Sequence, residues 1–392
     1  MATELIKVVD PDMGTGYDYD SLFDWEVAQQ GDLTGARDEI AIAKCRCTGG
    51  TADTGGYVYI NGWTTSATQY IKIWTDTSES YRHNGAWQTG NKYRLSLSNT
   101  VGIENNETDI VIDGLQIEIT SANGNYQTNV YAAAAIIIKN CVIKGHTNAS
   151  YVGGGISLAG PGNTYVLNCT IYNFNAAETN SMPMAINGAG TYYIYNCTLI
   201  GGYQGLKNSA GTVYAKNCYS RSNGGLSYNG TMTLTTCASS DTTGTAGLQS
   251  IALNTTNFVN VTSGSEDFHL PLGSALIGVA TNLYNDAAYP FQTDIDGQDR
   301  GGAAASWDIG ADEYVSSAAI EQEGFRFRND DGSESAATWK ANQDVNINLA
   351  ADTAFRLRFL LKATGNPDSI DAQAEARVKP SGGAFGAWEK IN

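Results

Sequence analysis

The middle of this 392-residue chain repeats one short pattern six times, and the period of the repeat restricts what the chain can fold into. Aligned on one position, successive copies are 26, 28, 28, 21 and 19 residues apart. A fifth asparagine–cysteine copy keeps only its cysteine (Thr236-Cys237), and the earliest copy (Gly114-Leu115) keeps only the surroundings. A repeat of this length indicates one supersecondary unit stacked many times. The four complete pairs are Asn140-Cys141, Asn168-Cys169, Asn196-Cys197 and Asn217-Cys218.

Mostly apolar residues flank each copy at fixed offsets. Positions −3, 0 and +2 relative to the cysteine do not share one face of a helix, but they fit two short strands separated by one turn residue. The pattern therefore predicts a parallel β-helix, whose coils repeat about every 4.8 Å. The flanking residues are Ile112, Ile138, Val166, Ile194, Ala215 and Leu234 at −3, and Ile117, Ile143, Ile171, Leu199, Ser220 and Ser239 at +2.

We expect the asparagine–cysteine ladder to be structural. Asn tolerates left-handed backbone angles at a bend, and its amide can bond to the Asn of the next coil, with each bond contributing about 1 kcal/mol. Cys is small and apolar, and stacked cysteines point the same way, which does not suit a disulfide. Two early cysteines, Cys45 and Cys47, lack the partners of a zinc site. The ladder cysteines predicted to be reduced core residues are Cys141, Cys169, Cys197, Cys218 and Cys237.

The segment before the repeat predicts a cap. Residues 21–29 suggest a short amphipathic helix with Ser21 and Asp24 as a capping pair. Such a helix can close the open first coil of a β-helix. We therefore expect an N-terminal cap over residues 1–40 and a β-helix over residues 41–265. The apolar side chains of the helix are Leu22, Trp25 and Val27, early strands fall at Tyr57–Ile60, Tyr70–Trp74 and Tyr93–Leu97, and a last rung falls at 251–262.

Three segments after the repeat carry a resemblance. DFHLPLGSALIGVA (267–280), TDIDGQDR (293–300) and WDIGADEY (307–314) resemble the closing part of bacterial and phage right-handed parallel β-helix proteins of the pectin-lyase-like superfamily. The resemblance covers roughly residues 1–315. It implies this fold, and a C-terminal cap of the β-helix over residues 266–318, more strongly than it implies an activity, because this fold hosts many functions.

The last part of the chain differs from the repeat. Short alternating runs predict a small antiparallel β-sandwich over residues 319–392. Its stretch FRFRNDDGSESAATW (325–339) resembles C-terminal modules of structural proteins of environmental tailed phages. The expected fold class is therefore all-β, a right-handed parallel β-helix with an N-terminal capping helix and a small C-terminal antiparallel β-sandwich. The runs are Phe325–Arg328, Val345–Asn348, Phe355–Leu361 and Ala372–Val378.

The superfamily resemblance raises a polysaccharide lyase or hydrolase as the enzyme hypothesis. Glycoside hydrolysis needs two carboxylates about 5–10 Å apart. Residues 121–265 contain only two acidic residues, Glu178 and Asp241, about three coils apart, so we assign no catalytic residue and expect no cofactor. The three histidines, His83, His146 and His269, share no local motif with a nucleophile or metal ligand.

One acidic group has two interpretations. The densest acidic group of the chain consists of Asp294, Asp296 and Asp299 with Arg300, Asp308, Asp312 and Glu313. Its Asp-x-Asp-Gly-x-Asp stretch (Asp294, Asp296 and Asp299) offers oxygen ligands for calcium, although the spacing does not match an EF-hand loop. Alternatively, Arg300 pairs with carboxylates of this region and turns at Gly297 and Gly310 shape the cap. We favour the second interpretation and expect no metal.

The outward positions of the repeat gather aromatic side chains. If −3 and 0 point inward, then −4 and −2 point outward, and this places Tyr165, Tyr193 and Tyr214 on successive coils beside Tyr195. One interpretation is cross-strand packing. The other is a contact surface, since amphipathic rings suit a sugar chain or a partner protein.

Charge and composition limit the partners. The net charge of −17 and the lack of a basic stripe argue against nucleic acid, and no stretch approaches 18 apolar residues, so we expect no membrane span. The start lacks the apolar core of a signal peptide. With the two resemblances, this favours a non-enzymatic structural protein of a phage virion, such as a capsid decoration, fibre or tail-associated protein, whose β-helix is a rigid spacer or display surface. Such a protein is made in the host cytoplasm, acts outside the cell and contacts capsid or tail proteins. A glycan-binding tail protein is the alternative, and spikes with this fold are commonly trimeric, so a homotrimer is one expected arrangement.

Overall fold

The computed structural model describes residues 2–120, 126–146, 152–175, 177, 179–315, 319–329, 331, 336, 338–348, 355–364, 375–376 and 389–390. Contacts divide the chain into two units, Met1–Tyr314 and Val315–Asn392. None of the helices within the described ranges is long and apolar enough to cross a membrane.

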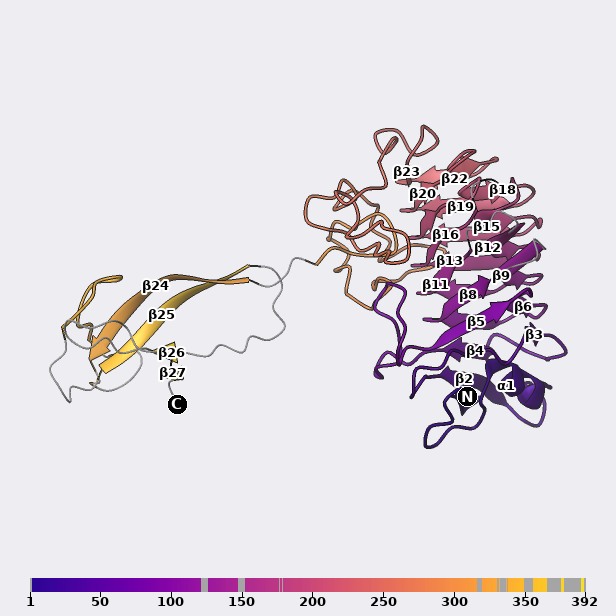
Figure 1. Cartoon of the computed structure of the whole chain (residues 1–392), viewed down its shortest axis with the longest axis horizontal. Helices are drawn as coiled ribbons and strands as arrows, with labels where there is room; N and C mark the ends of the chain where they lie inside the picture. Colours follow the sequence, from indigo (N-terminus) through magenta and orange to yellow (C-terminus); the bar gives the residue numbers. More distant parts are fainter. Residues whose placement is uncertain are drawn as a thin grey trace. The chain divides into compact units, whose positions relative to one another are not determined.

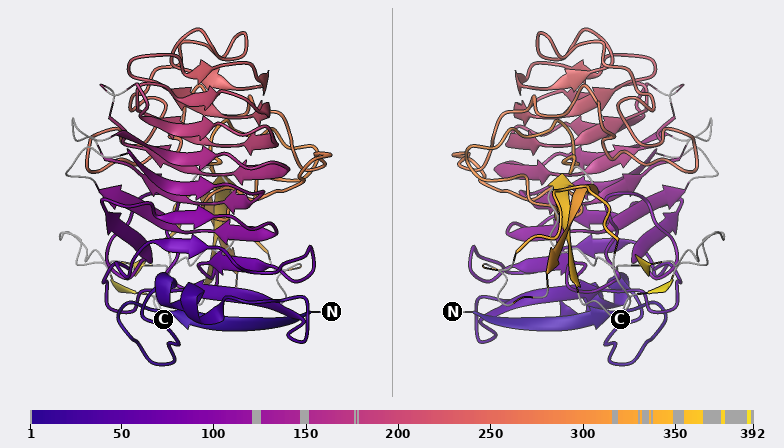
Figure 2. Two further views of the ribbon diagram at one scale, coloured as in Figure 1. Left: turned by 90° about the vertical axis from the view of Figure 1, so that its right-hand side faces the viewer. Right: turned by 90° about the vertical axis from the view of Figure 1, so that its left-hand side faces the viewer.

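Three parallel sheets form the first unit, and each full coil contributes one strand to each sheet (Figures 1 and 2). This confirms the predicted parallel β-helix. Sheet 1 contains β1 (Thr3–Val9), β2 (Glu39–Cys45), β4 (Ile71–Trp74), β7 (Ile110–Asp113), β10 (Ile137–Lys139), β13 (Asn163–Leu167), β16 (Thr191–Tyr195), β19 (Thr212–Lys216) and β22 (Thr233–Thr235). Sheet 2 contains β5 (Arg94–Ser98), β8 (Gln116–Thr120), β11 (Val142–Lys144), β14 (Thr170–Tyr172), β17 (Thr198–Ile200), β20 (Tyr219–Arg221) and β23 (Ala238–Ser239). Sheet 3 contains β3 (Val58–Ile60), β6 (Ile103–Asn105), β9 (Tyr126–Ala132), β12 (Val152–Leu158), β15 (Met182–Ile186), β18 (Leu206–Asn208) and β21 (Tyr228–Asn229).

The repeated asparagine is the turn between sheets 1 and 2. Its backbone is left-handed in every copy, with φ from 49° to 56° at the four asparagines, 46° at Thr236 and 76° at Gly114. Because of this bend, the strands before and after the turn direct side chains into the same interior. The ladder cysteines and the residues at +2 are buried in every coil. The −3 column is also buried, except that Leu234 in the last coil is partly exposed. The predicted inward columns are thus confirmed.

The side chains of the asparagine ladder bond to one another in part. The Nδ2 of Asn168 donates to Oδ1 of Asn140 at 3.2 Å, and the Nδ2 of Asn217 donates to Oδ1 of Asn196 at 3.1 Å. Between Asn168 and Asn196 the ladder is interrupted, because Oδ1 of Asn168 is buried without a hydrogen-bond partner and Nδ2 of Asn196 donates instead to the carbonyl of Asp308. The ladder therefore also forms a hydrogen bond to a later segment of the chain, at Asp308.

The predicted capping helix is present as α1 (Leu22–Gln29), which contacts the first strands of the solenoid (Figure 1). Ser21 is its N-cap and accepts a hydrogen bond from the backbone N–H of Asp24 at 3.0 Å. Leu22 and Trp25 are buried, and Trp25 stacks on Trp63 at 5.7 Å between ring centroids. The expected apolar role of Val27 is wrong, since its side chain is 59% exposed: it lies on the solvent side of the helix.

Residues 251–314 cover the flank of the solenoid, visible as the orange trace beside the coils in Figures 1 and 2. We call residues 266–314 the flank segment. The predicted last rung at 251–262 does not form a strand; Phe258 instead packs with Tyr172 and Tyr219 on the outer face of sheet 2. The segment expected as a cap over 266–318 is fixed along the turns, where Nδ2 of Asn168 donates to the carbonyl of Thr293 and Nδ2 of Asn217 donates to that of Thr281, both at 2.7 Å.

The second unit contains antiparallel pairs. β24 (Ala319–Asn329) pairs with β25 (Phe355–Thr364), and β26 (Glu375–Ala376) pairs with β27 (Glu389–Lys390). The predicted antiparallel pairing is confirmed, and the described strands form two separate two-stranded sheets. Residues 345–348 do not form the predicted strand, and most of the run 372–378 lies outside the described residues.

The Thr236 turn yields a stability prediction. Thr is β-branched and is strained at a φ of 46°, whereas Asn tolerates this region and stands there in four other coils. Replacing Thr236→Asn should raise the free energy of unfolding by about 1 kcal/mol, measured by chemical denaturation. The matched control is Thr235→Asn on the preceding strand residue, which should not be stabilising. A loss of stability in the Thr236 variant would contradict this account of the turn.

Candidate functional site

The predicted tyrosine column lies on the outer face of sheet 1. Tyr165, Tyr193 and Tyr214 are paired in register on β13, β16 and β19. Their rings stack with centroid separations of 4.9 and 5.5 Å and interplanar angles of 10° and 16°. Tyr214 is the most open of the three, with 36% of its surface exposed. Since each ring covers its neighbour's face, the column presents mainly ring edges and hydroxyl groups to its surroundings.

Tyr195 does not belong to this exposed surface. Its side chain is only 1% exposed and packs with Leu167, Leu283 and Trp307. Leu167 and Tyr195 do lie outside the coil, as the alternation predicts, but the flank segment covers them. The hypothesis of a four-tyrosine contact surface is therefore wrong for Tyr195, because sequence alternation does not show which outer positions another segment covers.

An apolar groove continues the column toward the N-terminus. Val111 on β7 and Ile137 on β10 occupy the register position of Tyr165. With Tyr70, Ala135 and Tyr165 they line a groove of about 330 Å³. The outer face of sheet 1 thus presents one continuous strip, which we call the sheet 1 strip, of aliphatic side chains followed by stacked tyrosines.

A second site, made of polar side chains, lies within the flank segment. The sequence placed Asp296 and Asp312 in one acidic group but did not connect His269 with them. The Nδ1 of His269 donates to Asp267, and its Nε2 lies 3.7 Å from Oδ2 of Asp296 and 4.0 Å from Oδ1 of Asp312. Gly85, from the loop between β4 and β5, lies over the imidazole, since a Cβ there would stand 2.6 Å from Nε2. We call His269, Asp296 and Asp312 the flank triad. Sequence spacing did not reveal it, because its members lie on three turns between 16 and 43 residues apart.

Burial and mutual charge shift the pKa values of these groups. Burial alone would lower the pKa of His269, but Asp267 and Asp296 raise it to about 11. Burial raises the pKa of Asp312 to about 6, and burial together with Asp296 raises that of Asp294 to about 8. Several carboxylates thus share a site with one imidazole.

Of the three aspartates considered for calcium, Asp299 does not converge with the other two. Asp294 accepts hydrogen bonds from the backbone N–H groups of Asp296, Gln298 and Glu313, and so holds the turn. Asp299 is exposed and accepts from the N–H of Gly301. Of these three aspartates, only Asp296 belongs to the flank triad.

Arg300 is fully buried and organises the flank segment. Its Nη1 donates to Oε2 of Glu313 at 2.8 Å, and its Nη2 donates to the carbonyls of Gly310 and Ala311. This is the arginine–carboxylate pairing expected of a structural segment. All seven cysteines are free and buried, and burial raises the pKa of the Cys218 and Cys237 thiols, as expected of unreactive core residues.

His83 is a buried neutral histidine next to the asparagine ladder. Its Nε2 lies 2.9 Å from the carbonyl of Asn140, and its Nδ1 accepts from the N–H of Gly85 at 3.0 Å. Nδ1 therefore has no room for a proton. Burial, reinforced by Arg82, lowers the pKa of His83 to about 3. His146 lies outside these clusters, after β11.

The three stacked sheets define a parallel β-helix protein. No family model and no curated protein matches the chain. Among solved structures, the crystal structure of pectate lyase Pel9A is similar over 80% of this chain and 97% of its own, at 13% sequence identity and a TM-score of 0.30.

Removing the buried arginine should loosen the flank segment. Arg300→Met leaves Glu313 buried without its cation, and this should lower the free energy of unfolding by about 3–5 kcal/mol. The control Arg37→Met breaks the more exposed Arg37–Glu39 pair and should cost about 0–1 kcal/mol. Thermal unfolding and limited proteolysis of both variants provide the measurement. Equal losses in the two variants would contradict the proposed role of Arg300.

Neutral His83 predicts a pH-dependent contribution to stability. Its folded pKa lies below the ordinary value of 6.5, so its contribution is present above pH 6.5 and is lost as the pH falls toward 3. The stability advantage of the wild type over His83→Gln should shrink by about 1.4 kcal/mol per pH unit between roughly pH 6 and 4. Arg82, Asp113 and Asp296, whose charges act on His83, are common to both proteins. Denaturation series at several pH values test this, and a pH-independent difference would refute it.

Proposed function

We propose that this chain is a non-enzymatic structural protein of a phage virion, in which the β-helix is a rigid stem that docks another virion protein along the sheet 1 strip. The phage setting rests on the resemblance of residues 325–339 to modules of phage structural proteins, together with that of residues 267–314 to bacterial and phage β-helix proteins. The docking role rests on the strip itself, an apolar groove continuous with in-register tyrosines.

The geometry of the tyrosines favours a protein partner over a glycan. Sugar rings bind aromatic side chains mainly through the ring face. In the strip, the faces of Tyr165 and Tyr193 are covered by neighbouring tyrosines, and Tyr289 leans against Tyr165 at 5.2 Å. Ring edges, hydroxyl groups and the aliphatic groove instead match the mixed apolar and polar character of a protein interface.

The scaffold supports the role of a stem. Neighbouring coils are joined by parallel backbone pairing in all three sheets, and the side chains inside are buried. Such a solenoid positions surface residues at fixed intervals. The strip therefore keeps one shape before and after docking, which reduces the entropy lost on binding.

The carboxylates near the repeat do not favour catalysis. The described strands from β10 to β19 contain no acidic residue. Asp241 accepts hydrogen bonds from the backbone N–H groups of Ser227 and Thr243 and thereby fixes a loop, while Glu178 lies outside the described residues. These positions supply no pair of carboxylates for glycoside cleavage.

The second unit supports an attachment role. Phe325 and Phe327 on β24 are opposite Phe359 and Leu357 on β25, so these four side chains share one face of the pair. Phe359 and Leu357 are exposed. A two-stranded sheet with an apolar face is marginally stable alone, which favours a partner that covers it.

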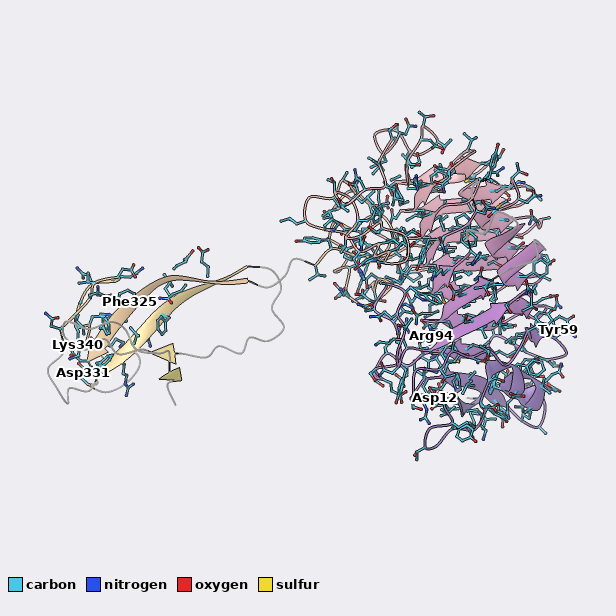
Figure 3. The ribbon with its side chains drawn as sticks, in the orientation of Figure 1. Asp12, Tyr59, Arg94, Phe325, Asp331 and Lys340 are labelled. Carbon is cyan, nitrogen blue, oxygen red and sulfur yellow. The ribbon has the colours of Figure 1, made fainter. Side chains whose placement is uncertain are left out.

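Virion assembly tests the docking role. The double variant Tyr193→Ser, Tyr214→Ser should remain folded and lose at least tenfold in incorporation when it complements a phage deleted for this gene. Tyr59→Ser is the matched control: Tyr59 is 40% exposed on β3 of sheet 3 (Figure 3), stacks on Tyr57, and lies away from the strip, so its loss should leave incorporation unchanged.

A glycan array distinguishes the docking role from the alternative, a glycan-binding tail protein. Normal incorporation of the folded tyrosine variant would refute docking at this surface. If the wild type also bound a glycan and the variant did not, the strip would be a receptor-binding surface. Release of unsaturated or reducing sugar ends from such a glycan would instead indicate an enzyme.

A further inference from the structure

Three ligand-type atoms face one another in the flank segment at separations wider than a hydrogen bond. The candidate donor atoms of His269, Asp296 and Asp312 all lie within 4.8 Å of one another. The nitrogen-to-oxygen separations of 3.7 and 4.0 Å fall between those of adjacent and opposite ligands on an ion with bonds of about 2.0–2.2 Å. Small side-chain movements would bring all three onto one cation.

The imidazole is oriented as metal-bound histidines usually are. Its Nδ1 proton is directed at Asp267, so Nε2 is the atom that faces Asp296 and Asp312 and that would bind a cation in place of its proton. A carboxylate on the far nitrogen fixes the tautomer and increases the basicity of the ligating one. Asp267 thus occupies the position of an outer-sphere partner.

The carboxylates are placed where a further positive partner is expected. The side chain of Asp312 is 6% exposed, with Oδ2 fixed by the N–H of Leu270 at 2.6 Å and Oδ1 directed at His269. Oδ2 of Asp296 faces His269 and accepts a hydrogen bond from Nε2 of Gln298 at 2.8 Å, whereas its Oδ1 is buried and has no hydrogen-bond partner. A buried carboxylate oxygen without a partner costs free energy, and a bound cation would offset that cost.

The nearest arginines are committed to other carboxylates. Arg300 pairs with Glu313 and Arg82 pairs with Asp113. Asp267, Asp296 and Asp312 therefore share one imidazole as their close basic group among the described residues. One divalent ion between neutral His269, Asp296 and Asp312 balances the charges of the two ligating carboxylates.

We propose that His269, Asp296 and Asp312 bind one divalent transition-metal ion, with Asp267 as the outer-sphere partner of His269. One nitrogen and two carboxylate ligands suit Zn²⁺ or Mn²⁺ better than Ca²⁺, which takes six to eight oxygen ligands. The ion joins three turns of the flank segment that are otherwise far apart in sequence, under the loop at Gly85. It acts as a structural clamp that is independent of docking at the sheet 1 strip.

Metal binding by the full chain tests this site. After treatment with a chelator and dialysis, the wild type should bind one equivalent of Zn²⁺ or Mn²⁺ per chain by calorimetry and elemental analysis, and should show at least tenfold weaker binding of Ca²⁺. His269→Gln and Asp312→Asn should each weaken binding at least 100-fold, and Asp267→Asn about 10- to 100-fold. Asp299→Asn, an exposed carboxylate on the same turn as Asp296, is the matched control and should bind as the wild type does.

A measurement on the wild type keeps the test independent of variant folding. Crystals soaked in ZnCl₂ should show an anomalous difference peak between His269 Nε2, Asp296 and Asp312. Binding of less than 0.1 equivalent, a peak at another place, or unchanged affinity in a folded His269→Gln variant would each overturn the proposal. In those cases the cluster is an imidazolium paired with carboxylates.

Discussion

The left-handed turn between sheets 1 and 2 is the constraint on which the first unit depends. At that position the chain must adopt a positive φ in every coil, and Asn, Gly or a strained Thr supplies it. The same turn directs a small core residue, usually Cys, inward on its C-terminal side. It also leaves an amide side chain outside, where it bonds to the next coil or to the carbonyls of Thr281, Thr293 and Asp308. One residue type therefore fixes both the coil and the segment that covers it.

The flank segment buries some outer surfaces of the solenoid and leaves others exposed. It covers Leu167 and Tyr195 on sheet 1 and the aromatic residues of sheet 2, and it contacts Tyr165 through Tyr289. It leaves the apolar groove and Tyr214 of the sheet 1 strip open. Its own interior contains several buried charged side chains, among them Arg300 with Glu313 and Asp312 of the flank triad. Buried charges are costly unless they are paired, so this segment is sensitive to the loss of a single partner.

Several parts of the structure followed from local rules. The period of the repeat, the inward columns and the capping pair of α1 each depend on residues close together in sequence, and all three were predicted. The burial of Val27 and the strand at 251–262 were predicted incorrectly. An apolar residue can lie exposed on a helix, and an apolar run can pack on an outer face of the solenoid without forming a strand. The flank triad was missed, because no local spacing relates His269 to Asp296 and Asp312.

By itself, the sequence determined the parallel β-helix, because backbone pairing and the turn conformation repeat with the residues that require them. It also determined which tyrosines lie outside the coil. Only the tertiary structure decided which of them remain accessible and which carboxylates meet a histidine. The physical reason is that burial by a distant segment and convergence of long-range side chains depend on how the flank segment packs against the coils, and neither the repeat period nor the alternation of a strand specifies that packing.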